Sequence, residues 1–323
     1  MKVLYILGGS RTGSTIVDNI LNEIDGFFSG GEIRFLWERI LEGRFCGCRR
    51  SFGDCSVWSA VLRDSFGFPQ ASTIDIDEVA RWQRESLRVV RTPRILRAVR
   101  SGDVTDASLR AFADVADRLY SGLGDVTGAR VIVDSSKRGS NGALLGLLPH
   151  VSAYYVHLVR DPRAVAYSRR RPKLNPDGRV PREMGLTGPV NSAISWLGWN
   201  LASEAVTRRT DPSRVLVVRY EEFSSRPAET IRRITQLLGE DGAALPFVDQ
   251  TTVRLRGNHT VSGNPSRFTD GIVPVRADDE WATNMATADR AVVTVLTAPM
   301  LVRYGYPLRA ETTSSADHRA TAR

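Results

Sequence analysis

The first residues with the types and spacing for chemistry form a glycine-rich turn near the start of the chain, GGSRTGST over residues 8–15. A wholly apolar run, residues 3–7, precedes the turn, and apolar residues at helical spacing follow it. Backbone N–H groups converge at such a strand-turn-helix junction, and the helix dipole adds partial positive charge. The turn therefore predicts a phosphate or sulfate site. A turn whose glycines serve backbone geometry alone is the alternative.

The turn departs from the P-loop of nucleoside triphosphatases at one position. The P-loop pattern places a lysine after its second glycine, and Ser14 stands there instead. Asp134 ends a later apolar run and imitates the acidic residue that binds Mg²⁺ in those enzymes. Because the loop lysine neutralises the transferred phosphate, its loss makes a P-loop kinase or NTPase only an alternative function. Arg11 is then the cation of the loop.

A second candidate anion site is HLVRDPRAVAYS, residues 157–168. Arg160 stands at the end of an apolar run, and Pro162 suits the first position of a helix. Ser168 follows eight residues after Arg160, so an arginine at a strand end and a hydroxyl on the next helix can hold one phosphate from two sides. By composition alone, the Arg-Asp-Pro sequence is equally suited to capping a helix.

The elements that must position these residues alternate along the chain. Further apolar runs end at Asp134, Val159 and Tyr220, and each is followed by a polar loop and a helical stretch. This alternation predicts an α/β, P-loop-like three-layer fold with a central parallel sheet flanked by helices. We expect one domain over residues 1–309, with a helical acceptor-binding insertion at about 33–125 and a mobile Pro/Gly-rich loop at about 172–190. Residues 310–323 are polar and predicted to be disordered.

Composition narrows the function classes. The 323-residue chain has a formal net charge of +8, from 41 arginines and three lysines against 36 acidic residues. Arginine suits phosphate and sulfate, whereas the scattered basic residues disfavour nucleic-acid binding. A non-enzymatic polyanion-binding protein is a further alternative. No apolar run reaches the length of a membrane span or signal peptide, so we expect a cytoplasmic protein. Whether it forms a homo-oligomer stays open.

Three cysteines, Cys46, Cys48 and Cys55, crowd into one short stretch. A zinc site normally has four ligands, and no histidine lies near them in the sequence. A disulfide from Cys55 to one neighbour is disfavoured in a reducing cytoplasm. We interpret the stretch as a tight loop with small buried thiols, and we predict no metal site.

Two of these motifs together carry a resemblance to a known family. SRTGST and RDPRAVAYS resemble the signature of sulfotransferases that use 3′-phosphoadenosine 5′-phosphosulfate (PAPS). The resemblance is to the bacterial branch, with features similar to tyrosylprotein and trehalose sulfotransferases. It implies that Arg160 and Ser168 bind the 3′-phosphate of PAPS. It also implies that the 5′-phosphosulfate is bound by the loop residues Ser10, Arg11, Thr12, Gly13, Ser14 and Thr15.

Later segments extend the resemblance in family order to about residue 307. VRYEEFSSRPAET resembles the family segment whose tyrosine contacts the adenine, which implies Tyr220. APMLVRYGY is similar to the closing helix of tyrosylprotein sulfotransferases. HTVSGNPSRF resembles the loop that closes over the nucleotide, and which of its residues touches the 3′-phosphate stays open, with Arg256 another candidate. The residues of this loop implied in nucleotide binding are His259, Gly263, Asn264 and Arg267.

Sulfuryl transfer to a hydroxyl needs a base and positive charge. His157 lies inside a strand pattern and His318 in the tail, so neither suits a base. The resemblance implies Glu32, in the sequence SGGEI, as the base. It also implies that Lys137, with Arg11, stabilises the departing sulfate, so that no catalytic metal is needed. Alternatively, the Glu32 carboxylate only interacts with the dipole of the helix that follows it, and Lys137 is a solvated surface lysine. The acceptor would be a small-molecule, sugar or phenolic hydroxyl.

Overall fold

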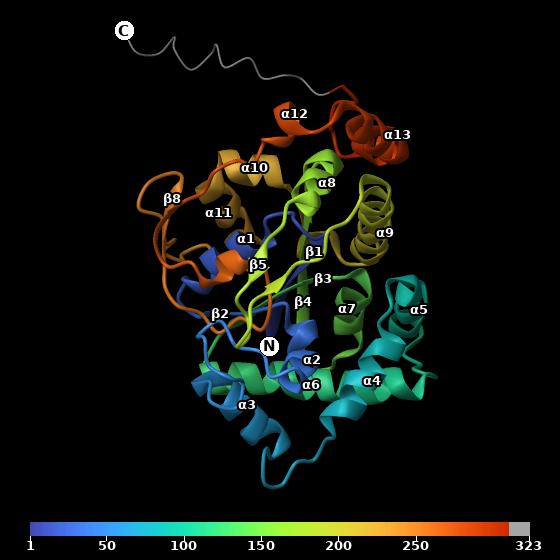
Figure 1. Ribbon diagram of the computed structural model, residues 1–323. Helices are drawn as coiled ribbons and strands as arrows, with labels where there is room; N and C mark the ends of the chain where they lie inside the picture. Colours follow the sequence, from blue (N-terminus) through green and yellow to red (C-terminus); the bar gives the residue numbers. More distant parts are fainter. Residues whose placement is uncertain (310–323) are drawn as a thin grey trace.

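A parallel sheet forms the centre of the protein, seen in a computed structural model that describes residues 1–309 (Figure 1). The predicted disorder of residues 310–323 lies outside the described residues. The apolar runs of the sequence become strands because backbone groups in a fully buried segment must pair with one another. The five strands are β1 (Lys2–Gly8), β2 (Phe27–Gly31), β3 (Val131–Lys137), β4 (Ser152–Val159) and β7 (Val215–Arg219).

All five strands are parallel and follow the order β2-β3-β1-β4-β7. β1 lies in the middle, with Val3 beside Ile132 of β3 and Ala153 of β4. Its residues 3–7 are completely buried. The chain therefore leaves β1 at the point where the following strands lie on opposite sides, which is where open α/β sheets form ligand sites.

Helices cover both faces of the sheet and produce the predicted three layers (Figure 1). On one face, Leu4 and Ile6 of β1 pack with residues of α1 (Ser14–Asn22) and α11 (Pro227–Leu237). On the other face, Val3, Tyr5 and Leu7 join a larger core. This period of two follows from the alternation of side chains along a strand. That larger core includes residues of α2 (Leu36–Leu41), α3 (Ser56–Phe66), α4 (Ile76–Ser86), α5 (Thr92–Ser101), α6 (Ala107–Thr127) and α7 (Gly139–Leu144).

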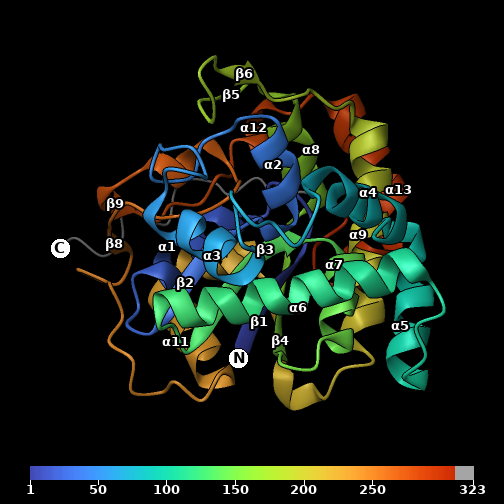
Figure 2. The same ribbon diagram turned by 90° about the horizontal axis from the view of Figure 1, so that it is seen from below.

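Figure 2 shows α6 lying across the base of the molecule, with α3 and α4 packed against it. Of the remaining helices, α9 (Pro189–Thr207) packs against β1, β4 and α7, and its Val206 joins the larger core. The others are α8 (Pro162–Arg170), α10 (Tyr220–Ser225), α12 (Trp281–Asn284) and α13 (Thr287–Arg303). Two small antiparallel hairpins complete the fold, β5 (Leu174–Asn175) with β6 (Arg182–Glu183) and β8 (Thr252–Leu255) with β9 (Gly271–Pro274).

The structure adds features that the sequence patterns did not predict. β2 was not expected, since only two of its five residues are large and apolar, yet it pairs with β3 along its length. β3 continues beyond Asp134 to Lys137. Its pairing with β1 contains a register shift between Tyr5 and Leu7, a bulge that redirects the end of β3. Among the helices of residues 1–309, none combines the length and apolar character needed to cross a bilayer.

Substitution of Gly13, which precedes α1, tests how closely the glycine-rich turn packs against Tyr220. It has φ of 83°, and an added Cβ would lie 2.6 Å from the Tyr220 ring. Gly43 has φ of 61° with open space around it. We expect Gly43→Ala to cost about 1–2 kcal/mol for left-handed backbone, and Gly13→Ala to cost about 1–3 kcal/mol more from overpacking. Urea unfolding of both variants measures the difference, and equal losses would contradict this packing.

Candidate active site

The carboxyl end of every strand of the sheet delivers at least one predicted site residue. The turn of residues 8–15 follows β1, and Glu32 follows β2 directly. Lys137 ends β3, Arg160 follows β4, and Tyr220 follows β7. Because parallel strands end at the same edge, residues separated by up to about 200 positions meet there.

These residues line one cavity of about 290 Å³. That size is at the lower end of ligand pockets in proteins. The cavity brings together most of the residues predicted from the sequence. Those that line it are Ser10, Arg11, Gly13, Ser14, Thr15, Glu32, Lys137, Arg160, Ser168, Tyr220, Gly263 and Asn264.

The glycine-rich turn has a strained backbone held by specific contacts. Arg11 has φ of 66°, a conformation that residues other than glycine rarely adopt. Arg160 stabilises it, since its Nη1 donates a hydrogen bond of 2.9 Å to the Arg11 carbonyl. Thr12 is buried and does not line the cavity; its hydroxyl donates to the Gly9 carbonyl at 3.0 Å. Thr12 therefore shapes the turn through its side chain.

Glu32 and Lys137 form a partly buried ion pair. Lys137 Nζ lies 2.7 Å from Glu32 Oε1, and their side chains are 11% and 15% exposed. Lys137 has φ of 72° at the end of the bulged strand β3. Arg34 Nη2 lies 3.7 Å from the other oxygen of Glu32. The backbone of Glu32 is also held, because its N–H donates to the Ser262 carbonyl at 3.1 Å.

These neighbours determine the charge of Glu32. Burial alone would raise the pKa of its carboxyl, but Lys137 and Arg34 together hold that pKa below its ordinary value. A base that works near neutral pH usually has a raised pKa, and the ion pair shifts the pKa of Glu32 in the opposite direction. In this arrangement Glu32 is ionised, and its basicity depends on where Lys137 points.

Arg160 is the most enclosed cation of the cavity. Its guanidinium lies over the Tyr220 ring, 4.2 Å from the centroid. Asp278 faces it, with 3.2 Å between Arg160 Nη2 and Asp278 Oδ2, and also pairs with Arg171. The Arg160 carbonyl accepts a 2.9 Å hydrogen bond from Trp196 Nε1. Tyr220 and Asp278 therefore hold the guanidinium of Arg160, and Trp196 holds its backbone. Ser168 lines the same cavity.

Positive charge exceeds negative charge around the cavity. Within residues 1–309, Arg11 Nη1, Arg160 Nε and Arg169 Nη1 are buried and lack a hydrogen-bond partner. Burial lowers the pKa of Arg11, and the nearby Arg169, Arg171 and Arg160 lower it further. Burial, Arg11 and Arg171 likewise lower the pKa of Lys173. Cations that repel one another at a shared cavity favour the binding of an anion there.

Two predicted residues of the closing loop lie outside the cavity. His259 turns toward the cysteines, with its Nδ1 3.2 Å from Cys55 Sγ. Arg267 is buried, and its guanidinium donates to the carbonyls of Thr260 and Phe45. Neither side chain lines the cavity, because both hold the loop to the rest of the protein. No histidine is close to the cysteines in the sequence, but the fold brings His259 to them from 204 residues away.

Sequence reasoning missed other residues of the cavity, chiefly Lys173, Met184 and Asp278. Lys173 and Met184 come from the 172–190 segment, and Arg11 Nη2 lies 3.6 Å from Met184 Sδ. Lys173 was detectable as one of only three lysines, within the loop expected to cover the site. Asp278 lies in an irregular segment before α12 and has no comparable signal.

The structure does not support Asp134 as a Mg²⁺ ligand. Its carboxylate accepts hydrogen bonds from Tyr120 Oη at 2.6 Å and from the Ser136 backbone at 2.8 Å. It does not line the cavity. His157, which the sequence disfavours as a base, is buried in β4 and hydrogen-bonded to Asn200, and burial lowers its pKa.

The five-stranded parallel sheet with helices on both faces defines a protein of the three-layer α/β class. Residues 4–243 match the profile described as the sulfotransferase family. This match spans well over half of the chain, so the protein belongs to the sulfotransferase family. Among curated proteins, no relative matches it.

Solved structures share this fold. The sulfotransferase domain of the Synechococcus PCC 7002 olefin synthase is 19% identical with a TM-score of 0.52, and the match covers 96% of each chain. A sulfotransferase domain from the curacin biosynthetic pathway is 16% identical with a TM-score of 0.51, covering 95% of this chain and 99% of that one. At these identities the likeness concerns the fold.

The lowered pKa of Glu32 predicts how its contribution to stability changes with pH. A carboxyl whose pKa is depressed by folding stabilises the folded state above its unfolded pKa of about 4.3, and this is lost as the pH falls through the folded value. We therefore expect the difference in free energy of unfolding between wild type and Glu32→Gln to shrink between about pH 6 and about pH 3. Urea titrations at each pH measure it. Glu229→Gln, which alters an exposed pair, is the control, and a difference independent of pH would contradict the prediction.

Proposed function

We propose that this member of the family transfers a sulfuryl group from PAPS to an acceptor hydroxyl and releases 3′-phosphoadenosine 5′-phosphate (PAP). The observation that carries this proposal is the group of buried, mutually repelling cations around one cavity. The phosphosulfate is anionic along its length, and charge-assisted hydrogen bonds to arginine are the strong ones. In this proposal the backbone of residues 10–15 and the side chain of Arg11 bind it.

Arg160 and Ser168 bind the 3′-phosphate in the proposed complex. Arg160 is buried and fixed by Trp196 and Tyr220, so its guanidinium is preorganised for an anion. The Asp278 carboxylate pairs with Arg160, which supports the proposal that an anionic group can bind to this guanidinium. The 3′-phosphate takes the place of the Asp278 carboxylate on Arg160. Tyr220, which shares this wall, is placed to contact the adenine.

Glu32 accepts the proton of the acceptor hydroxyl in the proposed reaction. The acceptor oxygen forms a bond to sulfur while the bond from sulfur to the bridging oxygen breaks, and the electron pair leaves with PAP. Lys137 stabilises the charge that develops on the bridging oxygen. Because Lys137 pairs with Glu32 at 2.7 Å, turning its ammonium toward the sulfate would also raise the basicity of Glu32.

We propose that the acceptor enters between the helices of residues 33–125 and the 172–190 segment. A second cavity of about 410 Å³ is lined by residues of this helical region and by Arg138 and Asn141 at the start of α7, with no residue of 172–190 among the described residues that line it. Arg34, which contacts Glu32, lines it together with Arg84, Arg88 and Arg138. This lining favours a small-molecule or carbohydrate acceptor that bears an acidic group near its reacting hydroxyl.

Radiolabelled PAPS and a panel of phenolic and sugar acceptors test the reaction and its base. We expect wild type to transfer label in Mg²⁺-free buffer, because Lys137 and Arg11 supply the positive charge. Glu32→Gln should lower turnover by about 10²–10⁴-fold, the usual loss of a general base, while calorimetry finds unchanged PAP affinity. Glu78→Gln, in an exposed pair on α4, is the control. Lost PAP binding would assign Glu32 a structural role.

Calorimetry with PAP and adenosine 5′-phosphate tests the nucleotide. Arg160→Gln should weaken PAP binding by about 10–100-fold, since a hydrogen bond to a charged group contributes about 1.5–3 kcal/mol. Adenosine 5′-phosphate lacks the 3′-phosphate, so the same substitution should weaken its binding by less than about threefold. Ser168→Ala should likewise lower the ratio of the affinity for PAP to the affinity for adenosine 5′-phosphate. The substitution Arg209→Gln, at an exposed arginine, should leave this ratio unchanged. Wild-type protein that binds ATP far more tightly than PAP would refute the proposal.

A further inference from the structure

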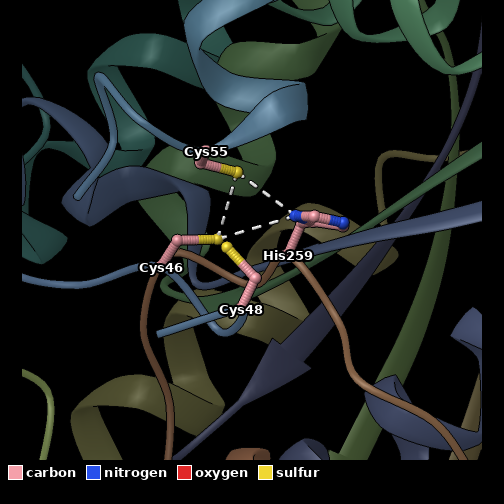
Figure 3. Close-up of side chains that lie close together, drawn as sticks. All are labelled: Cys46, Cys48, Cys55 and His259. Atoms are coloured by element: carbon pink, nitrogen blue, oxygen red, sulfur yellow. Dashed lines mark hydrogen bonds between the residues drawn. The ribbon is translucent and has the colours of Figure 1, made fainter. Parts of the chain in front are cut away.

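Three thiols and one imidazole converge outside the cavity described above (Figure 3). Cys46, Cys48 and Cys55 come from the loop between α2 and α3, and His259 follows β8. Cys55 Sγ lies 3.6 Å from Cys46 Sγ and 3.2 Å from His259 Nδ1, and Cys46 Sγ lies 3.9 Å from the same nitrogen. The four potential ligand atoms lie within 4.8 Å of one another.

We propose that Cys46, Cys48, Cys55 and His259 bind one Zn²⁺ ion. In a tetrahedral site with Zn–S of about 2.3 Å and Zn–N of about 2.0–2.1 Å, neighbouring ligand atoms are about 3.6–3.8 Å apart. The three observed separations of 3.2, 3.6 and 3.9 Å bracket these values. Thiolate and imidazole ligands favour zinc over magnesium or calcium. Binding releases the thiol protons to solvent and involves no redox step.

Backbone contacts hold the segments that carry the four ligands against one another. The Gly47 N–H, between two of the cysteines, donates to the Thr260 carbonyl at 2.9 Å. Trp58 Nε1 donates to the His259 carbonyl at 2.6 Å. A Cβ at position 47 would collide with the Asn258 side chain. The cysteine loop and the histidine segment are therefore packed backbone to backbone, as a preformed site requires.

The site is structural, because four protein ligands complete a tetrahedral shell and leave no position for substrate. None of its residues lines the cavity. The segment that carries His259 continues directly into Gly263 and Asn264, which do line it. The Ser262 carbonyl also accepts the backbone N–H of Glu32. The ion would thus fasten one wall of the active site to the helical region of residues 33–125, whatever nucleotide the cavity binds.

Metal analysis of the full chain, purified without a polyhistidine tag, tests the proposal directly. We expect about one zinc per chain, released when a mercurial reagent blocks the thiols. Chelation at elevated temperature should lower Tm by more than about 5 °C. Less than about a tenth of an equivalent of any transition metal, with no uptake of Zn²⁺ or Co²⁺, would overturn the proposal. So would three freely reactive thiols, or a Cys46–Cys55 disulfide found by mass spectrometry.

Two variants assign the ligands. Cys48→Ser and His259→Ala should each reduce the zinc content at least about tenfold. His150→Ala is the matched control, because His150 is an exposed histidine bonded to Asp117 and is not part of the cluster. It should retain zinc. Full zinc in His259→Ala would overturn the four-ligand site. If the variants do not fold, the zinc content and thiol-triggered release of the wild-type protein still decide the question.

Discussion

The pairing of β1 with a parallel strand on each side is the constraint on which the rest of this structure depends. Residues 3–7 of β1 are completely buried, so their backbone groups must be satisfied by β3 and β4. This pairing sets the glycine-rich turn between Lys137 and Arg160, one at the end of each neighbouring strand. A register change in β1 would shift the glycine-rich turn along the sheet relative to both cations.

The charged side chains at the strand ends are costly to bury, and they gather at one cavity. Glu32 and Asp278 balance Lys137 and Arg160, whereas Arg11 and Lys173 keep lowered pKa values beside other cations. A site built only for stability would pair or expose such groups. The same charges that destabilise the folded chain favour an anionic ligand, which accounts for their concentration at one cavity.

The wall formed by residues 258–267 links this cavity to the cysteine cluster. Arg267 and Asn258 occupy its interior, and their hydrogen bonds hold the segment in a compact turn. Gly263 is close to Thr15 of the glycine-rich turn, and Asn264 N–H donates to the Thr15 hydroxyl at 3.2 Å. Movement of this wall would therefore alter both the loop after β1 and the backbone around Glu32.

Local patterns in the sequence predict the α/β class and four of the five strands, through apolar runs and the glycines after the first of them. Most of the cavity residues follow from two such patterns, the glycine-rich turn and an arginine eight residues before a serine, together with the family resemblance that these motifs carry. Tertiary packing makes Phe27–Gly31 a strand, since its pairing with β3 and not its composition stabilises it. Tertiary structure also placed Asp278 on Arg160 and His259 among the cysteines. Such contacts join segments more than a hundred residues apart, and their partners are set by how the layers pack, which no local spacing encodes.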